Sequence, residues 1–178
     1  MGTTMAVAKD CRFYLGKTPK SATLASIDLL LLTEVNVERA NHKLRDLLAL
    51  WHDKRGTRAM PARADLGVTA LKPWLGNLAL IDIQDDGRGV FRLCGTNLHA
   101  RFGGEMTRRD VCELSPAIGD SFRACLEWAC RSQTPTESTH ERVIDGVSAA
   151  FSELHLPLSD DATHVHTLLF ASYPVIKK

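Results

Sequence analysis

Histidine side chains are among the residues of this sequence whose types and spacing could do chemistry. His164 and His166 alternate along a segment of strand-forming residues, so both would face the same side of a sheet. His140 and His155 fall on segments that we predict to be neighbouring strands. Four such imidazoles could hold a metal ion or a haem, but histidines on a half-exposed sheet are more often solvated or hydrogen-bonded. We therefore nominate no metal ligand.

Arginines form a second chemically capable set, because guanidinium groups bind phosphate and carboxylate well. Six of them could converge as an anion site: Arg55, Arg58, Arg63, Arg101, Arg108 and Arg109. Acidic residues stand close to them in the sequence, including Asp53, Asp65, Glu105 and Asp110. Scattered arginines with such neighbours more often form surface salt bridges. The arm from Arg55 to Asp65 is the more interesting part functionally.

Catalytic signatures are weak. Gly16-Lys17-Thr18 matches the end of a phosphate-binding loop, but the glycine required five positions earlier is Cys11. No Gly-x-Ser-x-Gly turn is present. We therefore predict a protein without a catalytic residue, and no cofactor can be identified.

Composition narrows the functional classes further. Among 178 residues, 22 Lys and Arg balance 21 Asp and Glu, so no strong field favours nucleic acid. Five cysteines without CxxC spacing argue against a zinc ribbon or a disulfide framework. The longest apolar stretch, residues 24–32, is far shorter than the ~18–20 residues of a spanning helix, and no signal-peptide pattern follows it. We expect a cytoplasmic protein without membrane insertion.

The elements that must position these residues begin with a helix. Residues 1–33 have no sustained period, which indicates a loosely ordered extension. Residues 34–56 then carry an apolar stripe at steps of three and four, typical of an amphipathic helix with Asn36 as its N-cap. The rest of the domain, residues 57–174, starts with an arm broken by Pro61 and Gly67.

Strand patterns occupy two separate parts of the chain. Residues 78–84 and 90–94 predict a β-hairpin, and residues 136–144, 149–158 and 163–173 predict three further strands. Asp145-Gly146 is a strong hairpin turn. Residues 96–131 between the two groups have helical spacing. This order favours an α+β fold with helices on one face of an antiparallel sheet and the other face free.

Local motifs resemble those of PAS domains. Residues 91–103 (FRLCGTNLHARFG) are similar to the second strand and first crossover helix of these domains. Residues 50–66, 71–82 and 156–161 resemble a family of short bacterial proteins built largely of one PAS-like domain. Arg108 stands where those relatives commonly have glycine. The resemblance implies a PAS-like five-stranded antiparallel sheet with crossover helices on one face, preceded by an amphipathic N-terminal helix.

The resemblance also implies a ligand cavity between the strands and the crossover helices. Alternation and helical phase nominate five wall residues, with two polar residues at the crossover start: Phe91, Leu93, Phe102, Phe122 and Trp128, then Asn97 and His99. A helix that precedes a PAS domain often dimerises. We therefore expect a homodimer through the helical stripe of Val37, Leu44, Leu47, Leu48 and Trp51.

Together these features predict a non-catalytic regulator in bacterial signalling that senses a small molecule or mediates protein–protein interaction. Ligand binding would shift helix arrangements and thereby change the contacts with an unidentified signalling partner. The alternative is an adaptor or dimerisation module without a ligand, which binds protein through the free face of its sheet. A weaker alternative is a metal- or haem-binding protein that uses the sheet histidines.

Overall fold

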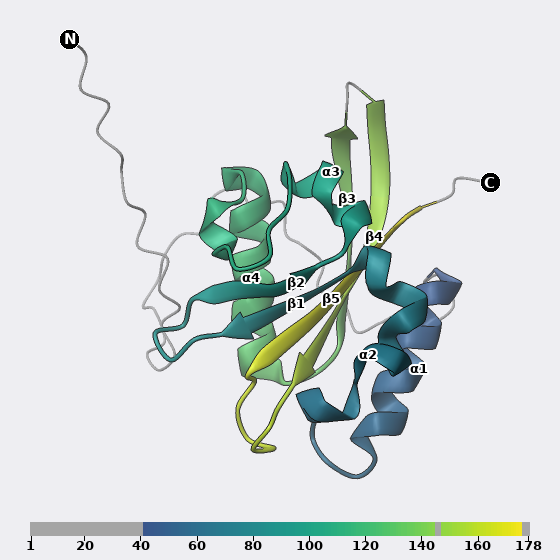
Figure 1. Cartoon of the computed structure of the whole chain (residues 1–178), viewed down its shortest axis with the longest axis vertical. Helices are drawn as coiled ribbons and strands as arrows, with labels where there is room; N and C mark the ends of the chain where they lie inside the picture. Colours follow the sequence, from purple (N-terminus) through teal and green to yellow (C-terminus); the bar gives the residue numbers. More distant parts are fainter. Residues whose placement is uncertain (1–40, 145–146, 176–178) are drawn as a thin grey trace.

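A five-stranded antiparallel sheet lies at the centre of the protein (Figure 1). The computed structural model describes residues 41–144 and 147–175. The spatial strand order is β2-β1-β5-β4-β3, so the first and last strands of the chain lie side by side in the middle. The strand bounds are β1 Leu78–Ile83, β2 Gly89–Cys94, β3 Thr136–Ile144, β4 Val147–Leu158 and β5 Thr167–Pro174. The predicted α+β architecture is confirmed.

Helices precede the first strand and connect β2 to β3. The α-helices are α1 His42–Arg55, α2 Val68–Leu71, α3 His99–Phe102 and α4 Pro116–Ser132. Short 3₁₀ turns join them: η1 Arg63–Asp65, η2 Lys72–Asn77, η3 Thr96–Leu98 and η4 Val111–Glu113. Asn41 caps α1, since its side-chain oxygen accepts a 2.9 Å hydrogen bond from the Lys43 amide. The predicted N-cap, Asn36, lies outside the described residues.

Helices cover both faces of the sheet. Leu80 of β1 and Leu169 of β5 pack against the buried stripe of α1, while their neighbours Ile81 and Phe170 pack against α3 and α4. Trp51 fixes α1 to the sheet, because its indole nitrogen donates a 2.9 Å hydrogen bond to the Pro157 carbonyl. The prediction of a free sheet face is therefore wrong. We call the face beneath α3 and α4 the interior face.

A bulge in the β1–β2 pair decides which side chains of β2 reach the interior face. Leu80 pairs with Leu93, but the next residue, Ile81, pairs with Phe91, so Arg92 is left as an extra residue. Phe91 consequently packs in the core under α3 and α4, and Leu93 packs in the core on the α1 side. Simple alternation, which puts both side chains on one face, fails here because of this extra residue.

The backbone conformation at Arg108 is one that glycine adopts more easily than other residues. Its φ is +71°, in the left-handed region that L-residues adopt at a cost. The Arg108 amide donates a 2.6 Å hydrogen bond to the Phe91 carbonyl, and Phe91 donates a 2.9 Å bond to the Arg109 carbonyl. This tight turn holds the segment after α3 against β2.

The turn between β4 and β5 is longer than predicted. Asp161 accepts backbone hydrogen bonds from Thr163 and His164, which fold residues 160–164 into a turn between β4 and β5. His164 and His166 therefore lie in a turn and not on a strand. The predicted Asp145-Gly146 turn lies outside the described residues, although Ile144 and Val147 on either side are paired.

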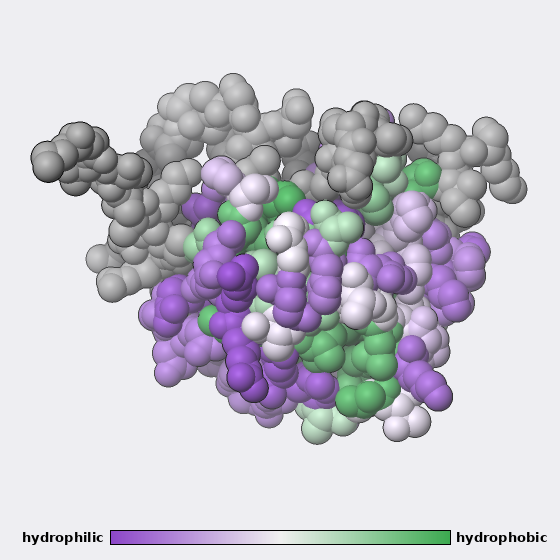
Figure 2. All heavy atoms as spheres, turned by 45° about the horizontal axis from the view of Figure 1, so that its top comes forward, coloured by the Kyte–Doolittle hydropathy of each residue, from purple (hydrophilic) through white to green (hydrophobic). Residues whose placement is uncertain are grey.

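The surface is mixed in polarity: hydrophilic residues cover much of the side seen in Figure 2, and hydrophobic residues gather toward its lower part. Among the residues whose side-chain exposure the structure describes, which leave out 117 and 142–148, the large apolar side chains that are exposed are Val68, Trp128 and Val175. None of the helices described is long and apolar enough to cross a membrane.

Candidate functional site

Four phenylalanine rings form one half of the interior face. Phe91 and Phe170 extend from the sheet, and Phe102 and Phe122 from α3 and α4. Their ring centroids lie 4.7 Å apart for Phe122 and Phe170 and 5.5 Å apart for Phe102 and Phe122. These separations are those of favourable aromatic pairs. We call these four residues the aromatic half.

Polar residues form the other half of the same face, where β3, β4 and β5 adjoin. Arg101 of α3 donates hydrogen bonds to the carboxylate of Glu153 and to the hydroxyl of Ser172. The Arg101 and Glu153 side chains are only 3% and 2% exposed. The Arg101 guanidinium carbon also lies 4.2 Å from the centroid of the Phe151 ring. A charged pair is thus enclosed within the fold.

The register of the sheet extends this polar half across the edge strand β3. Ser138 pairs with Glu153, and Thr136 pairs with His155. His140 Nε2 lies 3.3 Å from a Glu153 carboxylate oxygen and 3.2 Å from the Ser138 hydroxyl. The polar half therefore consists of Arg101, Thr136, Ser138, His140, Glu153, His155 and Ser172.

Several polar atoms of this half have no hydrogen-bond partner of ordinary geometry among the described residues. They are both ring nitrogens of His155, the Nε of Arg101 and the hydroxyl of Thr136. Buried polar atoms are nearly always hydrogen-bonded, because leaving one unpaired costs about 1–3 kcal/mol. Arg101 Nε and the Thr136 hydroxyl can donate, and His155 can donate from one nitrogen. Such donors suit a group that carries acceptor oxygens.

The electrostatics favour a neutral His155. Burial lowers the pKa of His155 to about 4. The negative charge of Glu153 and a contact with the Thr136 backbone oppose this shift in the pKa, and His140 adds to it. Glu153 itself has Arg101 and His140 beside it. The ring of His155 also lies 5.3 Å from that of Phe170. His155 therefore joins the polar half to the aromatic half.

The structure brings together only part of the predicted cavity wall. Phe91, Phe102 and Phe122 meet in the aromatic half. Leu93 packs on the opposite face of the sheet, and Trp128 is 42% exposed. Of the two polar candidates, Asn97 is exposed and His99 is partly buried beside Glu105.

The residues predicted for a dimer seam lie elsewhere. Leu44, Leu47, Leu48 and Trp51 are buried against the chain's own sheet, so within this fold they contact β4 and β5 and are not exposed to a second copy. Val37 lies outside the described residues. The helical stripe holds α1 in place over the face opposite the aromatic and polar halves.

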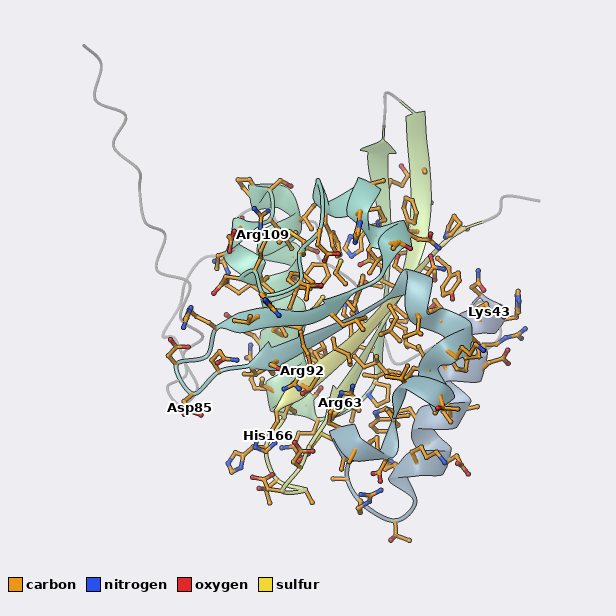
Figure 3. The ribbon with its side chains drawn as sticks, in the orientation of Figure 1. Lys43, Arg63, Asp85, Arg92, Arg109 and His166 are labelled. Carbon is orange, nitrogen blue, oxygen red and sulfur yellow. The ribbon has the colours of Figure 1, made fainter. Side chains whose placement is uncertain are left out.

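The nominated histidines and arginines do not form one site either. His164 and His166 lie beside Asp161 in the β4–β5 turn, whereas His140 and His155 lie in the polar half. Figure 3 shows Arg63 and Arg109 well apart on different elements. Arg58 pairs with Asp65 at 2.7 Å, and Arg101 alone of the six arginines lies in the polar half.

Sequence reasoning missed Glu153, Ser172 and Thr136. The sequence did contain a signal for Glu153, because this charged residue lies inside a predicted strand, residues 149–158, that is mostly apolar. A charged residue inside such a run is informative, since charges are seldom buried without a partner. Its partner, Arg101, is 52 residues away in the sequence and could not be paired with it by spacing.

Comparisons with known proteins identify the fold. The PAS domain family matches residues 39–171, which include α1 and most of β5. No curated protein matches the chain. The PAS domain of BvgS from Bordetella pertussis is 12% identical, with a TM-score of 0.51 over 62% of this chain and 84% of that one.

Two further solved structures are similar at lower scores. The light-state LOV domain of the blue-light photoreceptor Aureochrome1 is 15% identical, with a TM-score of 0.41 over 62% of this chain and 89% of that one. A sensory box sensor histidine kinase from Vibrio cholerae is 15% identical, with a TM-score of 0.44 over 65% and 94%. On its strand order, its crossover helices and a family match over most of its length, this chain belongs to the PAS domain family.

Proposed function

We propose that this chain is a cytoplasmic, non-catalytic regulator that binds a small organic molecule on its interior face. PAS domains are commonly sensory or signalling modules. The observation that carries the proposal is that Arg101 Nε, the Thr136 hydroxyl and the ring nitrogens of His155 are buried and make no hydrogen bond of ordinary geometry among the described residues. Unpaired buried donors lower stability, and a ligand acceptor would remove that cost.

The two halves of the face define the chemistry of the ligand. Arg101 is already neutralised by Glu153, so the polar half does not require a strongly charged partner. The adjoining phenylalanine rings suit an apolar body. A carbonyl, amide or carboxyl group attached to a small aliphatic or aromatic body fits both halves.

Helix α3 is the element that would report binding. Arg101 and Phe102, adjacent in α3, reach the polar and the aromatic half respectively. A ligand that binds one arrangement of α3 better than another shifts the population toward it. That change alters the surface offered to a signalling partner or a second copy.

Thr136→Val tests the proposal, because it replaces the unpaired hydroxyl by a methyl group of similar shape. We expect the ligand-free protein to become more stable by about 1 kcal/mol, as an unpaired buried polar atom is removed. Binding of acetate, butyrate, benzoate or the corresponding amides, measured by thermal denaturation and NMR line broadening, should weaken.

Trp128→Ala is the matched control, since Trp128 is 42% exposed and lies outside the polar half. It should leave binding of the same probes unchanged. Equal binding by the wild type and Thr136→Val, or loss of binding in Trp128→Ala, would contradict the proposed location.

A ligand-free interaction module is the second candidate. The observation in its favour is the contact among the four phenylalanine rings, which already fill the aromatic half. In that case the interior face is core alone, and regulation would depend on association with another protein. The absence of any response to the probe panel, together with a stable ligand-free chain, would favour it.

A further inference from the structure

Three side chains of different chemistry meet beside α3, outside the polar half. They are Cys94 at the end of β2, His99 at the start of α3 and Glu105 shortly after α3. One ligand atom from each lies within 4.8 Å of the other two. Among the residues that the structure describes, it is the only group of three or more Cys, His, Asp or Glu residues whose ligand atoms lie that close together.

Local backbone geometry creates this meeting point. Gly95 passes so close to the preceding segment that a Cβ there would lie 2.3 Å from the Leu75 carbonyl oxygen, so only glycine lets the chain turn after Cys94. Helix α3 then ends at Gly103 with φ +80°, and the Gly104 amide donates a 2.8 Å hydrogen bond to the His99 carbonyl. The reversal brings Glu105 back to His99.

Glu105 is held in a definite orientation. One carboxylate oxygen accepts hydrogen bonds from the Thr107 amide at 2.7 Å and the Thr107 hydroxyl at 2.6 Å. The other oxygen lies 3.0 Å from His99 Nε2. Thr107 thus acts as the kind of outer partner that orients carboxylate ligands at metal sites.

The His99 and Cys94 atoms have few competing partners. His99 Nε2 is buried and makes no hydrogen bond of ordinary geometry, although Glu105 lies beside it. Cys94 is a free, buried thiol whose sulfur makes a weak 3.9 Å contact with the Gly95 carbonyl. Burial raises the pKa of Cys94 to about 11, while the backbone of Met106 acts in the opposite direction.

We propose that Cys94, His99 and Glu105 form a binding site for one divalent transition-metal ion, with Zn²⁺ as the best-fitting ion. Sulfur, imidazole nitrogen and carboxylate oxygen are the ligands that zinc takes, at about 2.0–2.3 Å, usually with tetrahedral geometry. The Cys94 thiol releases its proton to solvent on binding. Three protein ligands leave the fourth position for water or an external ligand.

Exposure gives the ion an entry route. The Glu105 side chain is 54% exposed and that of His99 is 30% exposed, whereas Cys94 is buried beneath them. An ion can therefore enter from solvent and reach the sulfur last. A metal here would tie the end of β2 to both ends of α3, independently of any organic ligand on the interior face.

The test is titration of the reduced, untagged full chain with Zn²⁺ and Co²⁺. We expect one equivalent of Zn²⁺ per chain in a chelator-competition assay, and a near-ultraviolet thiolate-to-cobalt charge-transfer band with Co²⁺. Cys94→Ser should abolish this band, and Glu105→Ala should weaken Zn²⁺ binding by at least about 10- to 100-fold. Glu105→Ala changes an exposed side chain, and circular dichroism would verify that each variant folds.

Two control variants separate this site from other metal-binding groups. Cys130→Ser removes a different free thiol, and His166→Asn disrupts the group of His164, His166 and Asp161 in the β4–β5 turn. Both should retain the cobalt band and the zinc affinity. Failure to bind an equivalent of metal, or an unchanged band in Cys94→Ser, would overturn the proposal.

Discussion

Arg101 and Glu153 form an ion pair that is almost completely buried, although 52 residues of sequence separate them. The pair connects α3 to β4 beneath the crossover. Removing one partner leaves an uncompensated buried charge, which typically costs about 3–5 kcal/mol. We predict a loss of that size in the free energy of unfolding for Arg101→Met and for Glu153→Gln, measured by urea denaturation.

The surface pair Arg131–Glu127 provides the matched control. Its side chains are 74% and 43% exposed and its atoms are 3.8 Å apart, so Arg131→Met should cost less than about 1 kcal/mol. The double variant Arg101→Met with Glu153→Leu should recover much of the loss, since no charge remains buried. Equal small effects at both pairs would mean that Arg101 and Glu153 are not enclosed as described.

His155 should make stability depend on pH. Its pKa is lowered to about 4 in the fold against an unperturbed value near 6.5, so the unfolded chain binds a proton that the folded chain does not. Stability is therefore full above about pH 6.5 and falls as the pH drops from there toward 4. The expected loss is about 2 kcal/mol between pH 6.5 and pH 4.5.

His155→Leu isolates this contribution, because its neighbours Arg101, His140 and Glu153 remain. The difference in unfolding free energy between the wild type and the variant should change by about 2 kcal/mol over that pH interval. A difference that is constant with pH would show that His155 titrates normally and is not buried in neutral form.

Trp51 tests how α1 is attached to the sheet. Trp51→Phe leaves the Pro157 carbonyl without its 2.9 Å donor, and we predict a loss of about 1–3 kcal/mol in denaturant unfolding. Trp128→Phe, at a 42% exposed position, should stay within about 0.5 kcal/mol of the wild type. If Trp51→Phe left the free energy of unfolding unchanged but altered the native mass of the protein, the result would mean that α1 packs across a dimer and not on its own sheet.

Arg108 tests the turn that follows α3. Its φ of +71° strains an L-residue, and replacement by glycine removes about 1–2 kcal/mol of that strain. Glycine also makes the unfolded chain more flexible, which lowers the free energy of unfolding by a somewhat smaller amount. Arg108→Gly should therefore raise stability by about 0.5 kcal/mol. Gly103→Ala makes the opposite change at φ +80° in open space and should lower stability. A lower denaturation midpoint for Arg108→Gly would contradict this reading of the turn.

The fold could be predicted from the sequence because local signals agree with it. Runs of strand-forming residues located β1 and β2, and helical spacing located α4. At the β4–β5 turn, strand propensity gives the wrong expectation for His164. The Asp161 side chain accepts hydrogen bonds from the Thr163 and His164 amides, and these short-range bonds form a turn where residue types alone predict a strand.

Less of the candidate site than of the fold could be predicted from the sequence. Helical phase placed Phe102 and Phe122 correctly on the interior face, but the bulge at Arg92 moved Leu93 to the other side of the sheet. The Arg101–Glu153 pair depends on the position of α3 over β4, which spacing in the sequence does not encode. Residues brought together by long-range packing cannot be paired before the fold is known.

The most direct test of a sensory role is the native mass of freshly purified protein, compared with its mass after denaturation. A ligand on the interior face predicts extra mass per chain that disappears on denaturation and is reduced in Thr136→Val but not in Trp128→Ala. A chain that carries no extra mass and shows no response to the carboxylate and amide probes would contradict the proposal and leave the ligand-free interaction module as the better explanation.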